Sequence, residues 1–136
     1  MMSHFFSWYV LALGTGLVII SAIEVSAADK VFRLWKAWIF HRLFPIHGLL
    51  LSCGGLPLTF FRDTISGKIM FCIGLVVVLT GPFIMLFPGR IRNIFAMTEL
   101  ELREEGEPEG LVYFDAVIKG AAGIFFIYTI LSYGLL

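Results

Sequence analysis

Long apolar segments alternate with short polar ones along the whole chain. The apolar segments run from Phe5 to about Ala28, from Ile46 to Phe61, from Ile69 to Phe87 and from Leu111 to Leu136. A helix needs about 20 residues to cross a ~30 Å hydrocarbon core, and the first, third and fourth segments are long enough. The pattern predicts an all-α integral membrane protein.

The second apolar segment is too short to cross as it stands, because a ~1.5 Å rise per residue takes it only about 24 Å. The Gly54–Pro57 sequence inside it also favours a kink. Either the helix begins near Ile39, with Arg42 extending back to the lipid headgroups, or the segment is re-entrant. The sequence leaves open whether Gly54–Pro57 is a kink or a re-entrant break.

The distribution of lysine and arginine separates these two topologies. With four crossings, one side of the membrane holds only Arg62 and Lys68, and the other side holds eight cations: Lys30, Arg33, Lys36, Arg42, Arg90, Arg92, Arg103 and Lys119. A re-entrant second segment would change this eight-to-two division to six and four. Cytoplasmic loops carry the excess of cations, so four crossings are favoured.

We therefore expect one transmembrane domain, residues 1–136, in a bacterial inner membrane with both termini outside. The four transmembrane helices are expected at about 5–28, 39–61, 69–87 and 113–136. The cytoplasmic loop is expected at about 89–110.

Two stretches beside the spans have the composition of the headgroup zone. In the first, Trp35 and Trp38 lie among Arg33, Lys36 and Arg42, and tryptophan together with cations is typical of the membrane interface. These cations do not share one helical face, so the pattern predicts an interfacial segment without strong amphipathicity.

The second stretch follows the third span. Pro88 and Gly89 end that span at the cytoplasmic surface, and Arg90 and Arg92 then meet the anionic headgroups. The apolar residues near Phe95 predict a short helix in the interface.

The most polar part of the chain is Thr98–Gly110, which holds six glutamates and one arginine. Gly106 and Pro108 interrupt any helix there. This stretch is expected to be an acidic cytoplasmic loop. It is either a solvated connection or, over Glu99–Glu109, a docking surface for a basic cytoplasmic partner.

Composition supports the membrane assignment. Of the 136 residues, 59% are hydrophobic and 15% are charged, whereas a soluble domain carries roughly 25% charged residues. A formal net charge of zero argues against a nucleic-acid partner. Cys53 and Cys72 both lie in apolar runs and are expected to be small packing residues without a disulfide.

Three ionisable residues in or near the spans are candidates for function, because such residues are costly in a membrane. Glu24 is expected near the cytoplasmic interface, beside Lys30 or Arg33. Asp115 and Lys119 are four residues apart and are expected to form a helical ion pair. The alternative is that these charges belong to an ion or proton path.

The histidines do not predict a haem or metal site. His41 and His47 both precede the second span, and His4 belongs to the opposite side, so no pair has the matched depth that haem ligation needs. No cofactor is predicted. A bound lipid headgroup or quinone beside His47 stays open.

Small residues recur on single helical faces in two of the predicted spans. The expected helix-packing residues are Gly74, Gly81, Ala116, Gly120 and Gly123. Small-residue stripes let helix backbones approach closely in lipid. They serve packing either within the chain or between subunits.

The sequence contains no nucleophile with a base partner and no phosphate-binding loop, so we expect no catalysis. The favoured function is a small accessory or assembly subunit that contacts membrane lipid and other membrane protein subunits. The alternative is a small oligomeric ion- or proton-coupled transporter or channel. Glu24, Asp115 and Lys119 would then be its path residues.

Overall fold

The computed structural model describes residues 2–107 and 109–132, and every regular element in these ranges is a helix. The elements are α1 (Met2–Ser26), α2 (Ala28–Ile39), α3 (Phe44–Gly55), the 3-10 helix η1 (Leu56–Phe60), α4 (Ile65–Leu86), α5 (Pro88–Glu104) and α6 (Gly110–Ser132). The all-α prediction is confirmed for the described part of the chain.

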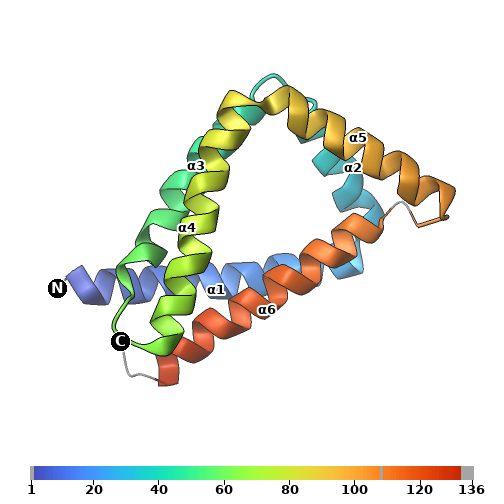
Figure 1. Ribbon diagram of the computed structural model, residues 1–136. Helices are drawn as coiled ribbons and strands as arrows, with labels where there is room; N and C mark the ends of the chain where they lie inside the picture. The colour runs from blue at the N-terminus through green and yellow to red at the C-terminus, as the bar shows by residue number, and fades with distance from the viewer. Residues whose placement is uncertain (1, 108, 133–136) are drawn as a thin grey trace.

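The helices form the three sides of a triangle (Figure 1). Along one side α1 lies against α6 and runs in the opposite direction, and along the second side α3 and η1 lie antiparallel to α4. These two helix pairs meet where α1 begins, α6 ends and η1 leads into α4. The third side consists of α2 and α5, which connect the far ends of the two pairs.

Three of the described helices are long and apolar enough to cross a membrane, namely His4–Ser26 within α1, α4 and α6. A fourth crossing is compatible with the structure if α2 and Phe44–Phe60 count as one span, although they are bent by 104° at the break between them. The expected spans 5–28, 69–87 and 113–136 fall on these helices to within a few residues. Residues 133–136 of the last one lie outside the described ranges.

The second segment begins later than the expected range 39–61. The chain turns after Ile39, and the backbone N–H of Phe44 donates to the carbonyl of His41 at 3.1 Å, so Arg42 lies in a turn. Gly54–Pro57 makes no break, because α3 continues directly into η1. Pro57 falls in the first turn of η1, and the nearby carbonyl of Gly54 accepts from the Tyr9 hydroxyl at 2.6 Å.

Helix α5 replaces most of the loop expected at 89–110. Pro88 occupies its first turn, which suits the fixed φ of proline. The helix ends just before Gly106, whose φ of 81° is left-handed and favours glycine. The short interfacial helix predicted near Phe95 is therefore part of a helix that extends to Glu104.

Helix α2 corrects a second expectation, because it is strongly amphipathic. Lys30, Arg33 and Lys36 share one exposed face, and Ala28 and Phe32 are buried on the other. Arg42 had obscured this pattern in the sequence. It lies beyond the end of the helix and does not follow the helical period.

Two buried apolar clusters hold the triangle together. The first joins the two helix pairs where they meet and consists of Val10, Leu58, Met70, Phe126 and Ile130. The second joins α2, α5 and the start of α6 through Ala28, Phe32, Phe95 and Val112.

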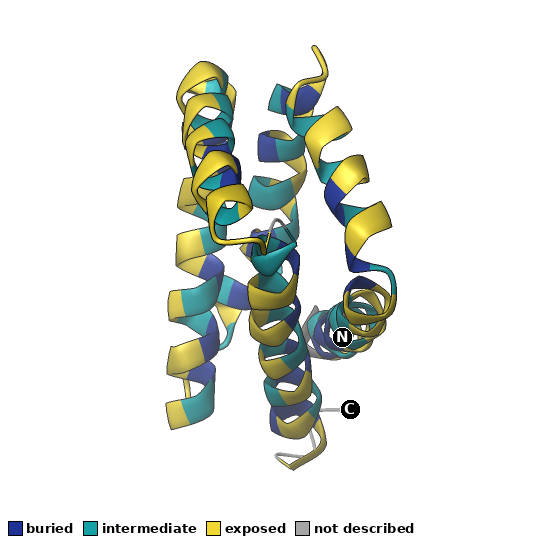
Figure 2. Ribbon diagram, turned by 90° about the vertical axis from the view of Figure 1, so that its right-hand side faces the viewer, coloured by how far each residue is buried: buried dark blue, intermediate teal, exposed yellow. Residues whose placement is uncertain are grey.

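Outside these clusters, the outward faces of the helices are exposed (Figure 2), and many of the exposed residues are large and apolar. At most 22% of the apolar window in each candidate span is buried. An exterior of this kind is compatible with lipid rather than water. Cys53 and Cys72 are free, but both are exposed on these faces instead of packed as expected.

Candidate functional site

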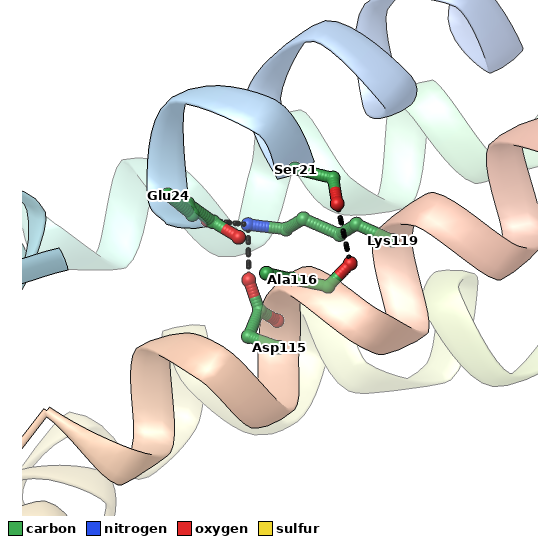
Figure 3. Close-up of polar contacts among 5 residues, drawn as sticks. All are labelled: Ser21, Glu24, Asp115, Ala116 and Lys119. Atoms are coloured by element: carbon green, nitrogen blue, oxygen red, sulfur yellow. Dashed lines mark hydrogen bonds and ion pairs between the residues drawn. The ribbon is translucent and has the colours of Figure 1, made fainter. Parts of the chain in front are cut away.

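Three charged side chains meet between α1 and α6 (Figure 3). The Lys119 ammonium donates to Glu24 Oε1 at 2.8 Å and also forms an ion pair with Asp115, one turn earlier on α6. Glu24 is only 2% exposed. These residues, here called the Glu24–Lys119–Asp115 triad, bring together all three ionisable candidates from the two spans.

Close packing of α1 against α6 makes this meeting possible. Ser21 Oγ donates to the carbonyl oxygen of Ala116 at 2.7 Å, which links the two backbones directly. A Cβ added to Gly123 would lie 2.6 Å from the carbonyl oxygen of Gly14, and one added to Gly120 would lie 2.9 Å from Ser21 Oγ. The absence of these side chains lets Lys119 reach Glu24 across the helix pair.

The triad contains two acidic groups and one basic group. When all three groups are ionised, one ammonium faces two carboxylates. Glu24 Oε2 is buried and has no hydrogen-bond partner among the described residues. The nearby hydroxyls are engaged elsewhere, because Ser21 donates to Ala116 and Ser26 donates to the carbonyl of Ala22. A buried charged oxygen without a donor is costly.

Helix α2 covers one side of the triad. The Trp35 ring centroid lies 5.3 Å from the Lys119 ammonium, a distance at which a cation is attracted to the ring face. The side chains of Lys119 and Asp115 remain 29% and 33% exposed. Glu24 is therefore buried, whereas Asp115 and Lys119 of the triad are partly exposed to solvent.

A second buried carboxylate lies between α2 and α5. The Glu99 side chain is 8% exposed, and its Oε1 lies 2.9 Å from the Lys36 ammonium and 2.7 Å from the Arg103 guanidinium. Here two cations face one carboxylate. Glu99 thus joins the two amphipathic helices and does not belong to the solvated loop expected for it.

The expected anchoring residues have different surroundings. The Arg92 guanidinium donates to the carbonyls of Ile39 at 2.8 Å and His41 at 3.0 Å, so it holds the turn between α2 and α3. Arg33 forms an exposed ion pair with Asp29 at 3.0 Å. Arg90 is exposed, with its guanidinium carbon 5.3 Å from the Phe87 ring centroid.

Aromatic rings surround His47 at the start of α3. Its ring stacks on Phe44 with centroids 6.0 Å apart and meets the edge of Trp38 at 6.3 Å. No group of three or more His, Cys, Asp or Glu side chains among the described residues is arranged to hold a metal ion. A lipid headgroup or quinone beside His47 stays a prediction.

All five expected packing residues lie at contacts between helices of the same chain. Ala116, Gly120 and Gly123 face α1. In the other helix pair, a Cβ on Gly74 would lie 2.7 Å from Leu58 Cβ, and one on Gly81 would overlap the carbonyl oxygen of Gly48. These contacts fit the first of the two alternatives, packing within the chain.

Sequence reasoning missed two partnerships. It expected Lys30 or Arg33 beside Glu24, and this was wrong, because the ion pair forms with Lys119 on another helix. It also left Glu99 in a loop, although Arg103 follows four residues later and provided a helical signal.

Comparison of the chain with known protein families, curated proteins and solved structures found no match.

Proposed function

We propose that the protein crosses a bacterial inner membrane four times, through α1, through α3 with η1, through α4 and through α6. Both termini lie outside, and α2 and α5 lie at the cytoplasmic surface. Eight of the ten lysine and arginine residues lie toward that end of the helices, in agreement with the positive-inside rule. The amphipathic α2, with its tryptophans, suits the interface.

Within this membrane the protein acts as a non-catalytic accessory or assembly subunit of a larger complex. The observation that carries this proposal is the outward face of α1. Ala12, Thr15, Ala22 and Ser26 are exposed there, between the large side chains of Trp8, Ile19 and Ile23, and a Cβ added to Gly16 would meet nothing within 4 Å. Small side chains on an exposed face let another helix approach closely.

Helix α6 turns three of its small residues, Ala116, Gly120 and Gly123, toward α1. Its large side chains Phe114, Val117 and Tyr128 are 68%, 70% and 64% exposed. Such side chains suit lipid, as do the exposed Trp8, Ile19 and Ile23 of α1. On α1, by comparison, the hydroxyls of Thr15 and Ser26 donate to carbonyls of their own helix, so a partner could pack there without burying an unpaired donor.

The acidic segment offers a second contact for the same role. Glu101, Glu104, Glu105 and Glu107 are exposed at the end of α5 and just beyond it, and they suit a basic cytoplasmic partner. Glu99 does not belong to this surface, because it is buried against Lys36 and Arg103.

Native mass spectrometry of the protein, extracted from its own membranes in mild detergent, tests the accessory role. The variant Ala12→Leu/Ala22→Leu enlarges two of the small exposed side chains of α1. The matched control Ala121→Leu adds the same group to the exposed face of α6. We expect the wild type and the control to migrate with different, larger subunits and the α1 variant to lose them.

A homo-oligomer, or a monomer with bound small ligands, would contradict the accessory role. So would a complex that survives the α1 variant intact. If the expected complex is found, the identity of its larger subunits supplies the biological process.

The second candidate function is proton- or ion-coupled transport by a small oligomer. The observation in its favour is the triad, since ionisable groups held between candidate spans are typical of ion paths. Glu24→Gln separates the two functions in reconstituted vesicles. Loss of transport with unchanged assembly would favour the transporter, whereas assembly without any measurable transport in the wild type would favour the accessory subunit.

A further inference from the structure

We propose that the Glu24–Lys119–Asp115 triad is a proton-binding site that holds one exchangeable proton on Glu24 at neutral pH. The site takes up this proton from water on the side of the molecule where α2 lies. The inference does not depend on the accessory role or on transport, because it concerns an equilibrium at one buried site.

The first argument is the charge count. Lys119 contacts both carboxylates, so fully ionised side chains leave one uncompensated negative charge in an apolar helix contact. Two carboxylates that share one site favour the binding of a proton between them. One proton makes the triad neutral, with Lys119 still an ammonium and Asp115 still a carboxylate.

The second argument is the unpartnered oxygen. Glu24 Oε2 is buried without a hydrogen-bond partner among the described residues. A proton on Oε2 removes the charge from this buried atom, and Oε1 still accepts from Lys119 at 2.8 Å.

The surroundings offer a proton route and few competing charges. From α6 the Lys119 ammonium contacts both Glu24 and Asp115, and the side chains of these two α6 residues are partly exposed. From α2 the neighbour of Lys119 is the neutral ring of Trp35. A proton from water therefore reaches Glu24 past Asp115, and no other bond forms or breaks.

The site within the same chain that should not bind a proton is Glu99. It is also buried, but two cations contact its carboxylate and favour the ionised form. This carboxylate provides an internal control, since the two variants Glu24→Gln and Glu99→Gln remove the same group from two buried positions.

Infrared spectroscopy of the full-length protein in lipid, titrated from neutral to alkaline pH, tests the proposal. We expect the C=O band of one protonated carboxylic acid per chain at neutral pH, with loss of that band on raising the pH. The band should be absent from Glu24→Gln and retained in Glu99→Gln. Helical circular dichroism checks that both variants fold.

The wild type alone can overturn the proposal, whatever happens to the variants. Absence of a protonated carboxyl band at neutral pH would show that the triad stays fully ionised. A band that persists in Glu24→Gln would place the proton on another residue. Neither result bears on whether the protein assembles with partners.

Discussion

Two glutamates are buried in this protein, and their surroundings differ in the sign of the excess charge. Glu24 lies between two candidate spans and shares one cation with Asp115. Glu99 lies between two amphipathic helices and has two cations of its own. Burial alone therefore does not define the behaviour of a carboxylate, since the number of neighbouring cations decides which protonation state is stable.

The two sites also differ in what their cations can do when the carboxylate is removed. Lys36 and Arg103 are 45% and 58% exposed, so water can solvate them. Lys119 is 29% exposed and lies against Trp35. The ion pairs of Glu99 join α2 and α5 near the protein surface. Those of Glu24 lie within the packed contact between α1 and α6.

The largest effect is expected from Lys119→Met, which keeps the length of the side chain and removes its charge. The Asp115 carboxylate would remain without a cation beside the protonated Glu24, and breaking a buried pair in this way costs about 3 kcal/mol. The midpoint of unfolding in detergent, followed by circular dichroism, measures this. Lys68→Met, at an exposed position on α4, is the matched control and should change little.

The double variant Lys119→Met/Asp115→Asn sharpens that result. Because Asp115→Asn removes the carboxylate that Lys119→Met leaves without a cation, we expect it to recover a large part of the stability lost in Lys119→Met. Independent sites would give additive losses. Additivity in this pair would contradict the shared role of Lys119 in the triad.

A smaller loss, of about 1 kcal/mol, is expected from Glu99→Gln. The change weakens hydrogen bonds to two charged groups, but both cations can turn to water. The same detergent unfolding experiment measures it. A loss as large as that of Lys119→Met would show that the third side of the triangle is as important to stability as the α1–α6 pair.

Arg103→Met should cost about 0.5 kcal/mol, as expected for a partly exposed ion pair. Lys36 remains to compensate Glu99, so no uncompensated charge is created. Unfolding at low and high salt checks the assignment, because screening should reduce this small difference further. A difference that grows with salt would contradict it.

The smallest effect on stability is expected from Glu24→Gln. A carboxamide resembles a protonated carboxyl group in shape and charge, and its oxygen can still accept from Lys119. We expect the unfolding midpoint to stay near that of the wild type at neutral pH. A loss of stability equal to that of Lys119→Met would indicate that Glu24 is ionised. It would contradict the proposed difference in protonation between Glu24 and Glu99.

Local patterns in the sequence predicted much of the helical framework. The lengths and hydropathy of the apolar runs placed α1, α4 and α6 to within a few residues, because both properties depend on neighbouring positions alone. The four-residue spacing of Asp115 and Lys119 predicted their ion pair for the same reason. The pattern failed at α2, where Arg42 beyond the helix end obscured the face formed by Lys30, Arg33 and Lys36.

The candidate functional site was harder to predict from the sequence than the fold. The sequence singled out Glu24 as an ionisable residue in a span, but it assigned the wrong partner, so the excess negative charge of the triad could not be foreseen. Likewise, no local signal distinguishes the outward small residues of α1, such as Ala12 and Ala22, from the inward ones of α6. Only the packing of the helices shows which face is covered.

The sequence by itself determined that this chain forms apolar helices, with cations concentrated toward one end and an acidic segment before the last apolar run. These are properties of composition and short-range order. The tertiary structure decided that Glu24 meets Lys119, 95 positions away. That contact depends on the alignment of α1 with α6, which close contacts at Gly14 and Gly123 and the Ser21–Ala116 hydrogen bond establish.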